Sequence, residues 1–98
     1  MAQRRATTQE RQPRKKRVTF TFEALEAQQV IVTGTFCDWQ IDFCSLKKDR
    51  KGQWKTTLNL LPGRYEYRFV VDGEWCDDPN CTERVPNEFD TENCVLRV

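Results

Sequence analysis

Two of the three tryptophans in the 98-residue chain stand in polar surroundings, where an aromatic side chain could contact a ligand. Trp39 follows Asp38 in a loop-like stretch, and Trp75 follows Glu74 just beyond a tight turn. This pattern is compatible with partial exposure and equally with burial as an anchor at the end of the fold. An exposed indole suits a flat, neutral ligand such as a pyranose ring, because the C–H bonds of the sugar meet the negative face of the aromatic system.

The hydroxyl groups of such a ring need amide, hydroxyl and guanidinium partners, and the sequence supplies candidates. Arg68 points away from the strand face that carries Tyr67 and Phe69, and Thr91 and Asn93 lie on the approach to the last strand. Taken singly, Thr91 and Asn93 are also ordinary turn residues, and Arg68 is also an ordinary solvated cation. The three residue types therefore indicate binding chemistry only in combination.

Catalysis is not expected. Histidine is absent, which excludes Ser-His and Cys-His nucleophile pairs and His-ligated metal sites. The adjacent carboxylates Asp77 and Asp78 do not resemble a glycosidase pair, which needs two carboxyls facing each other across a cleft roughly 5 to 9.5 Å wide. The sequence therefore predicts a protein that is not an enzyme, with no catalytic residue, no metal and no cofactor.

The cysteines form no disulfide framework and no tetrahedral zinc pattern, since their number is odd and only one pair is closely spaced. We expect reduced, partly buried thiols, with a zinc or redox role as the alternative. The five are Cys37, Cys44, Cys76, Cys81 and Cys94.

Charge divides the chain at residue 17. Residues 1–17 carry seven basic residues and one acidic residue, a net +6, whereas the remainder carries nine basic and fourteen acidic residues, a net −5. The first segment has too few apolar residues to fold, so we expect a flexible basic arm at 1–17 and a folded domain at 18–98. Neither a signal peptide nor a membrane-length apolar run is present, and we expect a soluble, cytoplasmic protein that does not contact a membrane.

Alternating apolar and polar residues predict an all-β sandwich of six to eight short antiparallel strands. Trp54 follows this alternation and is expected in the core. Asp72-Gly73 is the strongest hairpin signal, because both central positions of a type I′ turn need a positive φ. We expect a loop over residues 76–92. The predicted strands are residues 18–23, 30–34, 43–46, 54–60 and 65–71, a return strand that carries Trp75, and residues 94–98.

Three segments then give the pattern a specific resemblance. GTFCDW (residues 34–39), GQWKTTLNLLPGRYEYRFVVDGEWCDDP (52–79) and FDTENCVLRV (89–98) occur in the order and nearly the spacing of the family 48 carbohydrate-binding modules. The chain most resembles the glycogen-binding domain of the AMP-activated protein kinase β subunit, and it is similar to the N-terminal modules of branching enzymes and isoamylases. The resemblance implies an immunoglobulin-like (early-set) sandwich that binds α-1,4-glucans.

The resemblance also implies which side chains contact the glucan. Trp39 and Trp75 match the two stacking tryptophans of the family, and Thr91 and Asn93 match a threonine and an asparagine that hydrogen-bond glucose. Arg68 stands in place of a lysine, and its planar fork is a different donor from a point ammonium. Phe89 stands in place of a leucine that lines or pierces the glucan ring.

The sequence departs from the family in three places. Cys37-Asp38 replaces the usual asparagine pair, the loop from Pro79 to Phe89 is one residue longer, and Asp90 replaces a glycine. Aspartate tolerates a left-handed backbone better than most residues, so we expect Asp90 to preserve the turn.

The leading hypothesis is non-catalytic binding of an α-1,4-glucan polymer or malto-oligosaccharide, in a module that works beside a glucan-metabolising enzyme or a kinase subunit. One alternative is a protein-interaction sandwich that has lost the sugar site. Another is a basic arm that contacts nucleic acid or an anionic surface. Nucleic acid is not the expected partner, because the arm carries no aromatic residue to stack on bases.

Overall fold

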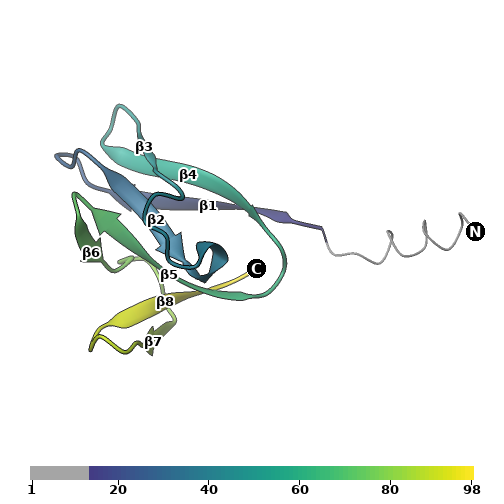
Figure 1. The fold of residues 1–98 in the computed structure, drawn as a ribbon. Helices are drawn as coiled ribbons and strands as arrows, with labels where there is room; N and C mark the ends of the chain where they lie inside the picture. Colours follow the sequence, from purple (N-terminus) through teal and green to yellow (C-terminus); the bar gives the residue numbers. More distant parts are fainter. Residues whose placement is uncertain (1–13) are drawn as a thin grey trace, which may run out of the picture.

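Eight strands form two antiparallel sheets in the computed structural model, which describes residues 14–98 (Figure 1). One sheet has the order β1-β4-β3, and the other has the order β2-β5-β8-β7 with β6 also paired to β5. A 3-10 turn, η1, spans Thr35–Cys37. The predicted all-β sandwich is confirmed. The strands are β1 (Lys16–Glu23), β2 (Val30–Gly34), β3 (Lys47–Lys48), β4 (Gln53–Leu60), β5 (Arg64–Val71), β6 (Glu74–Cys76), β7 (Arg84–Pro86) and β8 (Glu92–Arg97).

The core lies between the sheets because apolar side chains alternate along β1, β4 and β5. Phe22 in β1 stands opposite Trp54 in β4, and the ring of Phe22 packs 4.9 Å from that of Phe69 in β5. Trp54 is only 7% exposed, and its indole nitrogen donates a 2.9 Å hydrogen bond to the carbonyl of Ala24. The prediction that Trp54 belongs to the core is confirmed.

The turn between β5 and β6 has the conformation that the sequence predicts. Asp72 and Gly73 adopt φ angles of 49° and 87°. The carboxylate of Asp72 also accepts hydrogen bonds of 2.9 Å and 2.8 Å from the backbone amides of Gln28 and Gln29, which join this turn to the connection between β1 and β2. The turn between β5 and β6 is therefore fixed to the connection that leads into β2.

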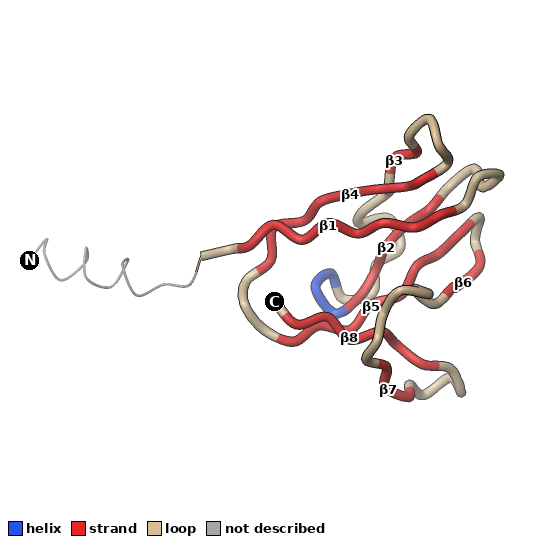
Figure 2. The backbone as a smooth tube through the Cα atoms, turned by 180° about the vertical axis from the view of Figure 1, so that it is seen from behind, coloured by secondary structure: helices blue, strands red, loops and turns tan. Residues whose placement is uncertain are grey.

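Two predictions of secondary structure need correction. Residues 43–46 form no strand of their own: they make one bridge, between Ser45 and Ile31, and the strand follows at Lys47–Lys48. The stretch 76–92 is not entirely a loop, because Arg84–Pro86 pairs with β8 as β7 (Figure 2). Three residues are too few to show an alternating pattern, and Pro86 suppresses the strand signal although an edge strand tolerates proline.

The start of the fold lies slightly before the predicted boundary, since β1 begins at Lys16 rather than at Val18. Residues 1–13 of the predicted arm lie outside the described residues, so its flexibility and its anionic partner stay predictions. Cys37 and Cys94 are buried and the other cysteines half-buried, as expected. Nothing helical in residues 14–98 has the length and apolar character needed to cross a membrane.

Candidate functional site

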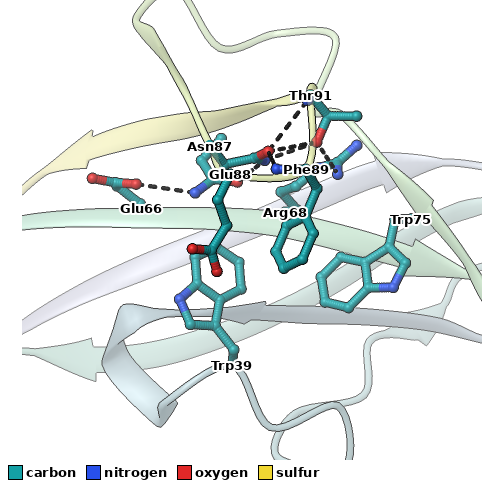
Figure 3. Close-up of a pocket in the computed structure, with 9 residues that line it drawn as sticks. Trp39, Glu66, Arg68, Trp75, Asn87, Glu88, Phe89 and Thr91 are labelled. Carbon is teal, nitrogen blue, oxygen red and sulfur yellow. Dashed lines mark hydrogen bonds between the residues drawn. The ribbon is translucent and has the colours of Figure 1, made fainter.

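A groove opens where the central strand β5 changes partners. β8 pairs with Arg64 to Tyr67, β6 pairs with Phe69 to Val71, and Arg68 lies between these two pairings. Because side chains alternate along a strand, Arg68 faces outward while its neighbours Tyr67 and Phe69 belong to the core. The segment that joins β6 to β8 and the loop after η1 border this outer face (Figure 3).

The groove has a volume of about 790 Å³ and is lined by nine residues. Six of them are the residues predicted from the sequence, which the fold brings together from four separate segments. Glu66, Asn87 and Glu88 complete the lining, and the sequence analysis missed them. The six predicted residues are Trp39, Arg68, Trp75, Phe89, Thr91 and Asn93.

Three aromatic side chains supply the apolar surface of the groove. The rings of Trp39 and Trp75 have centroids 6.3 Å apart and planes inclined by 49°. Trp75 is 46% exposed and Trp39 is half-buried, so the exposed alternative of the sequence analysis is the one found. Phe89 is 75% exposed and projects from the loop before β8 (Figure 3). The two indoles and the phenyl ring together form an accessible aromatic surface.

The loop that carries Trp39 is closed onto the end of β2 by its backbone. Asp38 and Trp39 both adopt left-handed φ angles, 55° and 60°, and the amide of Trp39 donates a 2.9 Å hydrogen bond to the carbonyl of Gly34. A Cβ atom at Gly34 would collide with the carbonyl oxygen of Glu66, so only glycine allows this close approach. The glycine of GTFCDW thus determines where the indole of Trp39 lies.

Arg68 is fixed rather than freely solvated. Its guanidinium donates hydrogen bonds of 3.1 Å to the Thr91 hydroxyl and 2.9 Å to the Asp77 carboxylate, and its Cζ atom lies 6.0 Å from the centroid of a Trp75 ring. The side chain is 12% exposed. Its Nε atom is buried and has no hydrogen-bond partner among the described residues. A buried donor without a partner is costly.

Asn87 organises the loop that presents Phe89. Its side-chain oxygen accepts hydrogen bonds from the amides of Phe89 and Thr91, at 2.9 Å and 3.2 Å, and its side-chain nitrogen donates to the Asn93 side chain at 2.9 Å. Asp90 has a φ of 62°, which confirms that aspartate preserves the left-handed turn. Asparagine is a common turn residue because its side chain can bond nearby backbone amides. The pair Pro86-Asn87 is therefore a turn signal that could have indicated Asn87 from the sequence.

Asn93 and Glu66 form the polar floor of the groove. Asn93 is 8% exposed and donates a 3.0 Å hydrogen bond to the Glu66 carboxylate, which also accepts a 2.8 Å bond from Arg64. These two hydrogen bonds, first that of Asn93 and then that of Arg64, lower the pKa of Glu66. Glu66 is therefore a charged acceptor at neutral pH.

The groove provides stacking surfaces and hydrogen-bonding groups rather than a metal centre. Within residues 14–98, no three histidine, cysteine, aspartate or glutamate side chains gather in a way that could hold a metal ion. Its aromatic side chains are accessible, while its polar side chains are ordered by bonds to one another. Such an arrangement suits a ligand that combines flat apolar faces with a rim of hydroxyls.

Comparison with known proteins finds segments similar to this chain within much longer proteins. "Protein PTST homolog 2, chloroplastic" of Arabidopsis thaliana is 42% identical over 53 residues, which is 54% of this chain and 10% of that protein. "Protein FLOURY ENDOSPERM 6, chloroplastic" of Oryza sativa subsp. japonica is 34% identical over 77 residues, 79% of this chain and 14% of that protein. "Phosphoglucan phosphatase DSP4, amyloplastic" of Castanea sativa is 31% identical over 67 residues, which is 68% of this chain and 18% of that protein.

The chain thus spans less than a fifth of the length of these three relatives. A family model covers far more of the chain. Residues 16–98, from the first residue of β1 to the end, match the model described as the glycogen recognition site of AMP-activated protein kinase. The match includes all the strands and the whole lining of the groove, and the chain therefore belongs to this family.

Proposed function

We propose that the groove binds α-1,4-linked glucans, such as glycogen, starch chains or malto-oligosaccharides. The observation that carries this proposal is the tilted pair of indoles, Trp39 and Trp75, 6.3 Å apart on an open face of the larger sheet. Two inclined rings form a concave apolar surface, and a chain of α-1,4-linked glucose is itself curved, so neighbouring glucosyl units can stack on both. Membership of a glycogen-recognition family supports the same ligand.

The polar side chains of the groove would bind the hydroxyls of the sugar. Arg68, Thr91 and Asn93 all line the groove, and Thr91 and Phe89 lie beside Arg68 (Figure 3). Each neutral hydrogen bond adds only about 0.5 to 1.5 kcal/mol net. With stacking included, the dissociation constant for a short oligosaccharide should lie on the order of micromolar to millimolar. Many repeated sites on one polymer would raise the apparent affinity for glycogen.

The proposed binding is non-catalytic. A glycosidase needs one carboxyl whose pKa is raised so that it can donate a proton. Glu66 has the opposite property, because hydrogen bonds from Asn93 and Arg64 lower its pKa. An ionised floor carboxylate serves as an acceptor for sugar hydroxyls, and we assign Glu66 this role.

A targeting role follows from the way related segments occur in other proteins. Similar segments form 10% to 18% of the three relatives, one of which is by name a phosphoglucan phosphatase. We propose that this module likewise brings a glucan-active enzyme or a kinase partner to the polymer. The relatives are chloroplastic or amyloplastic by name, and the cytoplasmic location that the sequence suggests for this chain stays a prediction.

Native gel electrophoresis with and without glycogen in the matrix tests the proposal. Glycogen should retard the wild-type protein, Trp75→Ala should abolish the retardation, and Trp39→Ala should weaken it. Phe43→Ala is the matched control, because Phe43 is a 50% exposed aromatic residue outside the groove and its loss should leave the retardation intact. A wild-type protein whose mobility glycogen does not change would contradict the proposal.

A further inference from the structure

Each aromatic residue of the groove has at least one acidic neighbour in the sequence. Trp39 follows Asp38, Trp75 follows Glu74, and Phe89 lies between Glu88 and Asp90. Each of these four acidic residues is exposed. Of these four residues, Glu88 is the one that lines the groove, together with Trp39 and Phe89.

Glu88 is the carboxylate best placed to act on a ligand. It lines the groove, and its side chain reaches toward the indole of Trp39, while the adjacent Phe89 points between the two tryptophans (Figure 3). Its carboxylate makes no hydrogen bond or ion pair with any other residue of the described range 14–98. The charge is therefore not neutralised locally, in contrast to that of Glu66, which Arg64 pairs at 2.8 Å.

The cations near the groove are already engaged. Asp77 pairs with Arg68 at 2.9 Å and with Arg84 at 3.2 Å, so these two guanidinium groups face a carboxylate. Among the nine lining residues, Arg68 is the single cation against the two carboxylates of Glu66 and Glu88. Because Arg64 pairs with Glu66 and Asp77 pairs with Arg68, Glu88 is the lining carboxylate whose charge no ion pair among the described residues offsets.

From this charge we propose that the groove discriminates between glucans by charge, and that Glu88 determines this specificity. It would accept uncharged stretches of glucan and disfavour glucosyl units that carry a phosphate monoester. A ring that stacks on an indole presents its C–H faces to the aromatic surface, so its hydroxyls, and any phosphate attached to them, lie at the rim of the stack, which Glu88 borders. A phosphate monoester carries about −1.5 to −2 charges at neutral pH and is repelled.

This inference rests on the proposed function and adds to it the chemical class of the favoured ligand. Calorimetric titration can compare maltoheptaose with maltoheptaose that carries one phosphate on a 6-hydroxyl. At an ionic strength of about 0.01 M, where charges interact over about 30 Å, the wild-type protein should bind the phosphorylated ligand roughly three- to tenfold more weakly. At about 1 M, where the screening length is about 3 Å, the two affinities should converge.

Two matched variants separate charge from steric exclusion. Glu88→Gln keeps the shape of the side chain and should reduce the affinity ratio between the two ligands at low salt by at least half. Glu26→Gln removes one negative charge from an exposed position outside the groove and should leave the ratio as in the wild type. The measured quantity is the ratio of the two affinities, so any general effect of Glu88→Gln on glucan binding cancels.

The outcomes distinguish a failure of charge discrimination from a failure of glucan binding. If both ligands bind equally, or if the ratio responds neither to salt nor to Glu88→Gln, the inference is wrong while glucan binding stands. If neither ligand binds, the proposed function is wrong and the inference falls with it.

Discussion

The hydroxyl of Tyr67 donates a 2.6 Å hydrogen bond to the carboxylate of Asp78, and both residues are buried. Asp78 lies three residues after Trp75, and its other carboxylate oxygen accepts a 2.9 Å bond from the amide of Asn80. Burial, and then the contact with Asp78, raise the pKa of Tyr67, so the phenol stays neutral. This pair ties the core strand β5 to the loop that follows β6, behind the groove.

Removing that hydroxyl should destabilise the fold. Tyr67→Phe would leave a buried carboxylate oxygen of Asp78 without its donor, which should cost about 1 to 3 kcal/mol of unfolding free energy. Urea denaturation followed by circular dichroism measures the loss. Tyr65→Phe is the control, since Tyr65 bonds the carbonyl of Leu61 at a more exposed place and should lose less. A larger loss for Tyr65→Phe would contradict this role of Asp78.

Replacing Arg68 should weaken binding without unfolding the protein. Arg68→Ala removes the donor in the groove and the link between Thr91 and Asp77, so the affinity for maltoheptaose should fall about tenfold, or 1.4 kcal/mol. Arg97→Ala removes an exposed ion pair with Glu83, outside the groove, and should change the affinity less than about twofold. Calorimetry measures both, and equal effects of the two substitutions would remove Arg68 from the proposed site.

Acid should destabilise the protein partly through Glu66. Its pKa in the fold is lowered from a reference value of 4.5, so it stabilises the fold above that value and loses this contribution as the pH falls through the folded pKa. Thermal unfolding from pH 6 to about pH 3 should show a decline that is shallower in Glu66→Gln. The pKa values of Glu83 and Asp49 are also lowered, so these residues contribute to acid destabilisation in the wild type and in the variant alike. Parallel curves would show that Glu66 contributes nothing.

The thiol of Cys94 should resist alkylation in the native protein. Burial raises its pKa to about 12, and the side chain has no exposed surface, so little reactive thiolate exists at pH 8. Mass spectrometry after brief treatment with iodoacetamide should find Cys44 and Cys81, which are half-buried, modified before Cys94. Rapid modification of Cys94 at a rate equal to that in urea would mean that β8 opens readily.

The parts of the fold that could be predicted are those determined by residues close together in the sequence. Trp54 belongs to an alternating strand, and Asp72-Gly73 can adopt the two positive φ angles of a hairpin turn, so both are readable from neighbours in sequence. The resemblance to a family supplied the six groove residues, which composition alone would not have connected. Strand β7 could not be predicted, because three residues are too few to show an alternation of apolar and polar side chains.

The unpredicted lining residues depend on long-range pairing. Glu66 reaches the groove because β8 pairs beside it, with Glu66 opposite Val95, and because η1 packs over β5 with the Thr35 hydroxyl 3.1 Å from the Glu66 amide. Glu88 enters the groove only because Asn87 folds its loop back toward the sheet. The pairing beside Glu66 is not expressed in the local sequence. The Asn87 turn is a local feature, but the sequence does not show that this turn lies over β5 and brings Glu88 to the groove.

The most direct test of glucan binding observes the three indole N–H groups by two-dimensional ¹H–¹⁵N NMR during titration with maltoheptaose. Trp54 serves as an internal reference, because its indole is buried and bonded to Ala24 at 2.9 Å. We predict that the signals of Trp39 and Trp75 shift progressively and saturate while that of Trp54 stays in place. Three unmoved indole signals at millimolar oligosaccharide, or a shift confined to Trp54, would contradict the account.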